Sequence, residues 1–125
     1  VRNPWDLMVS KYYYSHLPAA GISFKKMILS IDGVKLRHHH NLKFNQADFI
    51  NSNINYVGRF ENLQGDFDII CDKIGMPRQQ LEKLNTTKHP PYWECYDSQT
   101  RDIVARKYKK DLETFGYKWE PMLGF

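Results

Sequence analysis

The sequence NPWDLMVSKYYYSH at residues 3–16 predicts an amphipathic helix near the start of the chain. Asn3 is a good N-cap, and Pro4 suits the first helical position because the N–H that proline lacks would have no helical partner there. Asp6 places a negative charge in the first turn, where it interacts favourably with the helix dipole. Apolar residues recur at spacings of three and four and form one stripe: Trp5, Met8, Val9, Tyr12 and Tyr13.

Further helical segments follow this helix along the chain. They are expected at residues 24–31, at 44–50 as a helical turn within a loop, at 66–74 and at 77–84. Ser23 is a good N-cap for the first of them, and Gly75 is a typical C-terminal residue for the third. In the third segment the side chains expected to face inward are Phe67, Ile69, Ile70, Cys71 and Ile74.

The longest predicted helix spans residues 98–115. Asp97 or Ser98 is its expected N-cap, and Gly116 is expected to end it. Apolar residues repeat on one face with the helical period: Ile103, Val104, Tyr108, Leu112 and Phe115. We expect these five side chains to pack inward.

Residues 54–60, INYVGRF, are the best candidate for a β-strand, because apolar and polar side chains alternate over part of the stretch. Residues 34–53 are mostly polar and read as a loop. The pattern as a whole therefore predicts a mainly α-helical chain with one or two short strands.

The length and composition indicate one folded domain over residues 1–125. Hydrophobic residues make up 42% and charged residues 26%, so the chain is not expected to be disordered, and no apolar run is long enough for a transmembrane span. Two cysteines allow one bridge at most, and a reducing compartment is the simpler expectation. The net charge of +4 favours an anionic ligand but is too small to indicate a nucleic-acid binder.

Arg2 and Ser10 form the first candidate site. An arginine just before a helix N-terminus, with a hydroxyl two turns later, can bind a phosphate group, because the guanidinium offers a planar set of donors and the helix end adds partial positive charge. The alternative is an ordinary surface arginine and a serine on a solvated helix face.

Two loops contain the other candidate residues. The loop TTKHP at residues 86–90 contains Lys88, which could bind an anion together with backbone amides, although surface loops of this composition are common. The loop at residues 38–40 contains three histidines, but adjacent imidazoles cannot all reach one ion and no further ligand stands at zinc spacing. We therefore expect no metal site and find no catalytic set of residues.

Two other readings remain open at this point. A separate basic binding module could bind a sulfated glycan or another polyanion through a patch of Arg2, Lys11, Lys25, Lys26, Lys35 and Arg37. Such binding should fall steeply with salt and show no nucleotide selectivity. The chain could also be a structural domain that binds no ligand.

Three stretches of the sequence resemble one protein family in the expected order. Residues 1–14, VRNPWDLMVSKYYY, resemble the 3′-phosphate-binding motif of sulfotransferases that use 3′-phosphoadenosine 5′-phosphosulfate (PAPS). Residues 56–63, YVGRFENL, followed by Asp66-Phe67 and the helix ending at Ile74-Gly75, are similar to the strand and helix that follow this motif. Residues 108–117, YKKDLETFGY, are similar to the family's closing Y-x-x-D-x-x-x-F-G-Y. The similarity is greatest to the carbohydrate branch, which includes heparan 2-O- and chondroitin sulfotransferases and bacterial relatives.

This resemblance implies an α/β parent fold, similar to P-loop NTPases, with a parallel sheet flanked by helices. It implies PAPS, or its product adenosine 3′,5′-bisphosphate, as the cofactor and a carbohydrate hydroxyl as the acceptor, with no nucleic-acid partner. Arg2 and Ser10 match the residues that bind the 3′-phosphate, and Lys88 lies where further cofactor contacts are often found. The compartment would be the cytoplasm in a bacterium or the Golgi lumen in an animal.

The family's 5′-phosphosulfate loop and catalytic base have no counterpart in these 125 residues, and both precede the 3′-phosphate motif in the family. The chain thus resembles the C-terminal half of a sulfotransferase domain, and we expect it to have no sulfotransferase activity alone. We also expect a homo-oligomer, because the helix faces and the strand at residues 54–60 that a missing sheet would cover should associate.

Overall fold

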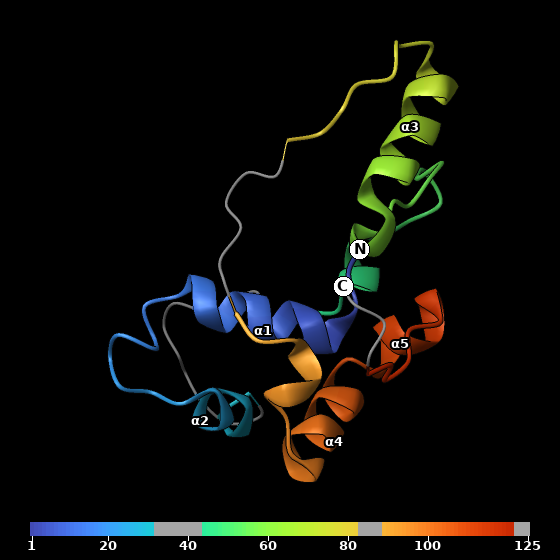
Figure 1. The fold of residues 1–125 in the computed structure, drawn as a ribbon. Coiled ribbons are helices and arrows are strands. Elements are labelled where there is room, and N and C mark those ends of the chain that lie inside the picture. The colour runs from blue at the N-terminus through green and yellow to red at the C-terminus, as the bar shows by residue number, and fades with distance from the viewer. Residues whose placement is uncertain (32–43, 83–88, 122–125) are drawn as a thin grey trace.

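A computed structural model describes residues 1–31, 44–82 and 89–121. These residues form helices joined by loops (Figure 1). The α-helices are α1 (Pro4–Tyr14), α2 (Phe24–Leu29), α3 (Leu63–Ile74), α4 (Ser98–Lys107) and α5 (Lys109–Phe115). The short 3-10 helices are η2 (Gln46–Phe49), η3 (Phe60–Asn62) and η4 (Tyr92–Glu94).

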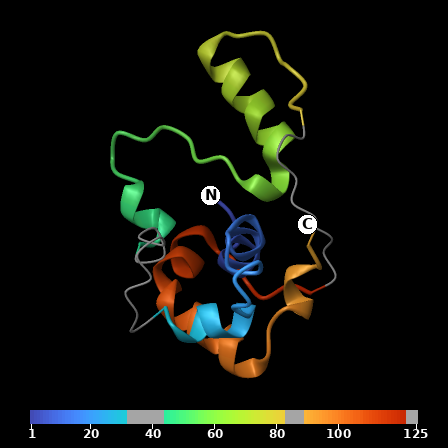
Figure 2. The same ribbon diagram turned by 90° about the vertical axis from the view of Figure 1, so that its left-hand side faces the viewer.

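α1 lies at the centre of the molecule, and α2, α4 and η4 all pack against it. In Figure 2, where α1 is seen nearly end-on, these segments lie along its side. The core is made of buried side chains from all four elements and their connections: Trp5, Met8, Val9, Tyr12, Leu17, Phe24, Met27, Ile28, Tyr92, Val104 and Tyr108. The prediction that α1 packs through its apolar stripe is therefore confirmed, with Tyr13 half-buried at its edge.

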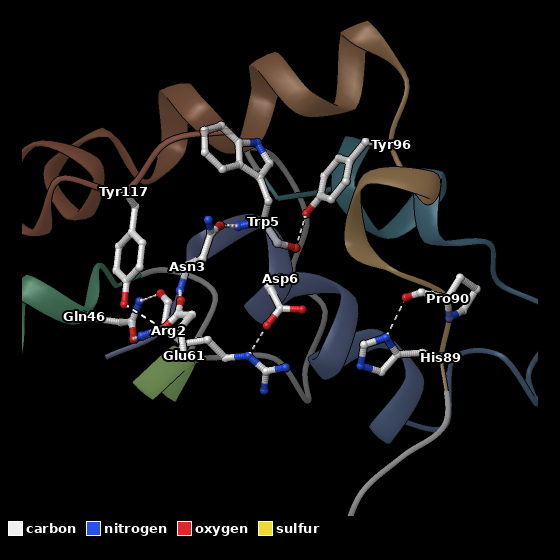
Figure 3. A network of polar contacts seen from close by, with 10 residues as sticks. All are labelled: Arg2, Asn3, Trp5, Asp6, Gln46, Glu61, His89, Pro90, Tyr96 and Tyr117. Atoms are coloured by element: carbon white, nitrogen blue, oxygen red, sulfur yellow. Dashed lines mark hydrogen bonds and ion pairs between the residues drawn. The ribbon is translucent and has the colours of Figure 1, made fainter. Parts of the chain in front are cut away.

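The polar atoms of the aromatic core side chains form hydrogen bonds. The Trp5 indole N–H donates to the Arg101 carbonyl at 3.1 Å, and the Tyr96 hydroxyl donates to the Trp5 carbonyl at 2.8 Å (Figure 3). The Trp5 and Tyr96 rings both meet the Trp119 ring edge-on, with centroids 5.4 Å apart in each pair. These contacts fix α1 to the C-terminal part of the chain, because a buried N–H or O–H without a partner would be costly.

The helix predicted at residues 98–115 is divided at Tyr108 into α4 and α5. Tyr108 has φ −109° and ψ 30°, outside the helical range, and its buried side chain belongs to the core. The N-cap Asp97 and the left-handed Gly116 at the C-terminal end are confirmed. Of the five side chains predicted to face inward, Val104, Tyr108 and Phe115 are buried, and Ile103 and Leu112 are half-buried.

The predicted α/β fold is wrong for the described residues: they contain no strand and hence no parallel sheet, and only the mainly α-helical part of the prediction holds. Residues 54–60 are extended or irregular up to η3. Among the described residues, Val1 alone forms backbone pairs with this stretch: its terminal amino group donates to the Gly58 carbonyl at 2.7 Å, and its carbonyl accepts from the Phe60 N–H at 2.7 Å. One paired residue is too little for a ladder, so local alternation does not produce a strand here.

α3 projects away from the other helices (Figure 1). It begins at Leu63, three residues earlier than the predicted start, and ends at the left-handed Gly75 as predicted. Of its apolar side chains only Cys71 is fully buried, and Ile69 and Ile74 are exposed. The prediction of an inward apolar face on this helix is therefore wrong for those two residues. Residues 77–82 form no helix, and Leu84 lies outside the described residues.

The described helices are too short or too polar to cross a bilayer, in agreement with the sequence analysis.

Candidate functional site

The candidate site lies on the polar side of α1, at its N-terminal half. Arg2, Asp6 and Ser10 are spaced by four residues each and therefore project from the same side of the helix. The apolar stripe that faces the core is on a different side of the helix. Arg2 and Ser10 are partly exposed, whereas Asp6 is buried.

The Arg2 guanidinium is held by two neighbours, Asp6 and Phe60, and Figure 3 shows its contact with Asp6. Its Nε donates to the Asp6 carboxylate at 2.5 Å, and its Cζ lies 3.8 Å from the centroid of the Phe60 ring. The Arg2 side chain is 17% exposed and that of Asp6 3%. Within the described part of the chain the two terminal amino groups of Arg2 make no hydrogen bond. The guanidinium is thus fixed in orientation, with two parallel donors available to an anion.

The backbone at Arg2 and Asn3 is fixed from both sides. The Gln46 side-chain amide donates to the Arg2 carbonyl at 2.7 Å and accepts from the Arg2 N–H at 2.9 Å. The Glu61 carboxylate accepts from the Asn3 N–H at 2.6 Å and from the Tyr117 hydroxyl at 3.0 Å (Figure 3). Burial and the nearby Glu61 charge raise the pKa of Tyr117, so this hydroxyl keeps its proton and its donor role.

The start of α1 follows from its own capping residue. The Asn3 side-chain oxygen accepts from the Trp5 N–H at 3.0 Å, and its amide nitrogen donates to the Lys118 carbonyl at 3.2 Å. Asn3 is 1% exposed, so it both caps the helix and ties it to the C-terminal segment. This cap determines where the helix begins, and hence where Arg2 stands relative to the first turn.

Ser10 is half-exposed, and its hydroxyl makes no hydrogen bond with any described residue. It stands one turn beyond Asp6 on the side that bears Arg2. The hydroxyl is therefore available as a donor to a group bound beside α1.

Lys88 lies outside the described residues. Its neighbour His89 stacks on Tyr13, with ring centroids 5.8 Å apart and an angle of 21° between the planes. Tyr13 follows Ser10 by three positions on α1, so the described end of this loop contacts the same helix as the candidate site.

The sequence analysis missed the residues that position Arg2. Asp6 was assigned to the helix dipole, although its four-residue spacing from Arg2 on a helix also indicates an ion pair. Phe60, Gln46 and Glu61 are 44 to 59 positions away along the chain, and a single sequence carries no signal that brings them to Arg2 and Asn3.

The described members of the predicted basic patch have different surroundings. Arg2 precedes α1 and pairs with Asp6, whereas Lys11 lies in the last turn of α1 and is half-buried. Lys25 pairs with Asp97 at 2.7 Å, and Lys35 and Arg37 lie outside the described residues.

No group of histidine, cysteine and carboxylate side chains that could hold a metal ion occurs in residues 1–31, 44–82 and 89–121. The histidines at residues 38–40 lie outside these ranges. The site on α1 offers the two terminal amino groups of Arg2 and the Ser10 hydroxyl as hydrogen-bond donors, and such donors suit an anion.

Comparison with known proteins gives a relative but no family. No family model and no solved structure matches the chain. It is similar to an uncharacterized protein from Archaeoglobus fulgidus, with 27% identity over 96 residues that cover 73% of this chain and 77% of that protein.

Proposed function

We propose that the chain forms the 3′-phosphate-binding part of the cofactor site of a sulfotransferase that transfers a sulfuryl group from PAPS to a carbohydrate hydroxyl. Arg2 and Ser10 would bind the 3′-phosphate, and Lys88 would add a cofactor contact. The proposal starts from the three sequence motifs, and the arrangement of side chains on α1 supports it.

The main support is the fixed Arg2 guanidinium. The Arg2 Nε donates to the Asp6 carboxylate, and the Phe60 ring covers one face of the guanidinium. The two terminal amino groups are therefore left in a geometry that suits two phosphate oxygens. The negative charge of Asp6 is almost fully buried and bonded to Arg2, which reduces its repulsion of a phosphate. Pre-orientation also lowers the entropy lost when the anion binds.

In this proposal the chain contributes to binding and positioning, and the bond-breaking groups lie elsewhere. Sulfuryl transfer needs donors at the 5′-phosphosulfate and a base for the acceptor hydroxyl, and these 125 residues contain no match for either. We expect the isolated chain to transfer no sulfuryl group from labelled PAPS to a panel of glycans. Transfer by the pure chain would contradict this division of roles.

Self-association is proposed as well, through the apolar side chains that α3 exposes. Ile74 is 63% and Ile69 40% exposed, and Met76 beyond the helix is 45% exposed. Exposed apolar groups of this kind favour contact with another copy. Light scattering during size-exclusion chromatography measures it, and a strictly monomeric chain would contradict it.

Calorimetric titration with two nucleotides tests the cofactor proposal. Adenosine 3′,5′-bisphosphate and adenosine 5′-monophosphate differ only in the 3′-phosphate that Arg2 and Ser10 would bind. We expect the bisphosphate to bind about 10- to 100-fold more tightly, as expected for one or two charge-assisted hydrogen bonds. Equal affinities would contradict the proposal.

A further inference from the structure

A groove of about 330 Å³ lies between α1 and the segment around η2. Its volume is at the lower end of the range for small-molecule sites. α1 forms one wall with Leu7 and Met8, and the segment around η2 forms the other with Phe44, Phe49 and Ile50. The Phe44 and Phe49 rings meet edge-on, with centroids 5.8 Å apart. The two walls together make a mostly apolar surface open to solvent on one side.

Lys11 brings a positive charge into this apolar surface. Its side chain lines the groove, is half-buried, and makes no ion pair or hydrogen bond with the described residues. Burial lowers the pKa of the Lys11 ammonium, and the Asp111 charge opposes this with a smaller effect. A partly desolvated ammonium without a partner gains from an anion that enters the same apolar space.

Asp111 is the acidic residue of the groove, and its carboxylate is already engaged. One oxygen accepts from the Gln46 N–H and the other from the Ala47 N–H, both at 2.8 Å. Asp111 is 1% exposed, so it serves to join α5 to η2. With one free ammonium and one neighbouring carboxylate, the groove suits a monoanion better than a phosphate dianion.

The geometry points to a binding site for a small carboxylate with an apolar chain or ring, its carboxylate on Lys11 and its apolar part between Met8 and Phe49. The size of the groove suits a ligand of about ten non-hydrogen atoms, such as a medium-chain fatty acid. Neither Arg2 nor Ser10 lines this groove, so the site is distinct from the proposed nucleotide site.

Octanoate and 1-octanol test the inference, because they share a chain and differ in charge. Titrations followed by amide NMR should show that octanoate binds about tenfold more tightly than octanol, with shifts in α1 and η2. Lys11→Met should remove this preference. The matched control Lys26→Met changes an exposed lysine on α2 and should behave as the parent chain.

Two further variants test the contribution of the apolar wall and the independence of this site from the nucleotide site. Phe49 is 71% exposed, so Phe49→Ala should leave the fold intact and weaken both ligands by a similar factor. Arg2→Ala should leave octanoate affinity unchanged, so that failure here is distinct from failure of the cofactor proposal. The inference is overturned by equal binding of octanoate and octanol, by a preference that survives Lys11→Met, or by a dimer that covers the groove and excludes octanoate.

Discussion

At the scale of single residues, the orientation of the Arg2 guanidinium depends on two neighbours that contact it through different kinds of interaction. Asp6 fixes the guanidinium by a charge-assisted hydrogen bond, and Phe60 fixes it by contact of the cation with the ring face. The Asp6 carboxylate is buried and would be left unpaired if Arg2 were removed. Replacing Arg2 should therefore lower the stability of the fold as well as ligand binding. Phe60 is 45% exposed and offers a cleaner test.

Phe60→Ala should weaken binding of adenosine 3′,5′-bisphosphate about two- to fivefold, because an exposed cation–π contact is worth about 0.5–1 kcal/mol. Phe49→Ala, an exposed phenylalanine away from Arg2, is the control and should leave the affinity unchanged. Calorimetry measures both. An equal loss in the two variants would show that Phe60 does not act through Arg2.

Asp97 gives a prediction for acid stability. Its carboxylate accepts from the Lys25 ammonium and from the Thr100 N–H, and these bonds hold the pKa of Asp97 well below its ordinary value. Because the folded-state pKa is below the unfolded one, the stabilisation is present above about pH 4 and is lost as the pH falls further.

Asp97→Asn keeps a good N-cap but removes the titrating charge. We therefore expect the variant to lose less stability than the parent chain between about pH 4 and pH 2, as measured by urea unfolding at each pH. Asp102→Asn, at a residue 74% exposed with a 4.0 Å contact to Arg101, is the control and should follow the parent chain. Equal acid sensitivity of Asp97→Asn and the parent chain would contradict the assignment.

These residue-level features were only partly predictable from the sequence. Asn3, Ser23 and Asp97 were correctly assigned as caps, because a cap depends on residues within one turn. The Arg2–Asp6 pair also depends on local spacing. Contacts such as Glu61 with Asn3 depend on the tertiary fold and left no local pattern.

At the scale of elements, α1 depends on Asn3 at its N-terminus. Asn3→Ala would remove the cap to the Trp5 N–H and the bond to the Lys118 carbonyl. We expect a loss of about 1–2 kcal/mol in the free energy of unfolding. Asn3→Ser retains a capping oxygen and should cost less. Urea denaturation measures both, and an alanine variant as stable as the serine variant would show that the cap contributes little.

Most of the helices predicted from periodicity formed, whereas the strand predicted at residues 54–60 and the helix predicted from residue 77 did not form in the described residues. Helices satisfy their hydrogen bonds within one segment, so α1, α2 and α4 could be predicted from local sequence. A strand needs a partner, and the stretch from Ile54 to Phe60 pairs with Val1 alone among the described residues. The alternation of apolar and polar residues therefore predicted a strand that does not form.

At the scale of the whole molecule, stability should be unevenly distributed. The core cluster unites α1, α2, η4 and α4 but includes no residue of α3, whose main packing partner is η3. α3 buries little besides Cys71 and Asp66, and the Asp66 carboxylate bonds to the Arg59 N–H at 2.7 Å. Sequence periodicity showed that α3 is amphipathic but not what its apolar side would meet.

Hydrogen exchange should reveal this difference. Amides of α3 should exchange faster than those of α1 and α4, because helices with few buried contacts open at lower free energy. Mass spectrometry of the exchanged chain measures it. Equal protection of α3 and α1 at low protein concentration would contradict this division of the molecule.

The most direct test of the proposed cofactor site combines Arg2→Ala with the two nucleotides. The parent chain should prefer adenosine 3′,5′-bisphosphate to adenosine 5′-monophosphate, and Arg2→Ala should abolish that preference while the weak binding of the monophosphate stays the same. Circular dichroism verifies that the variant is folded. A folded Arg2→Ala chain that retains the full preference for the bisphosphate would contradict the assignment of the 3′-phosphate to Arg2.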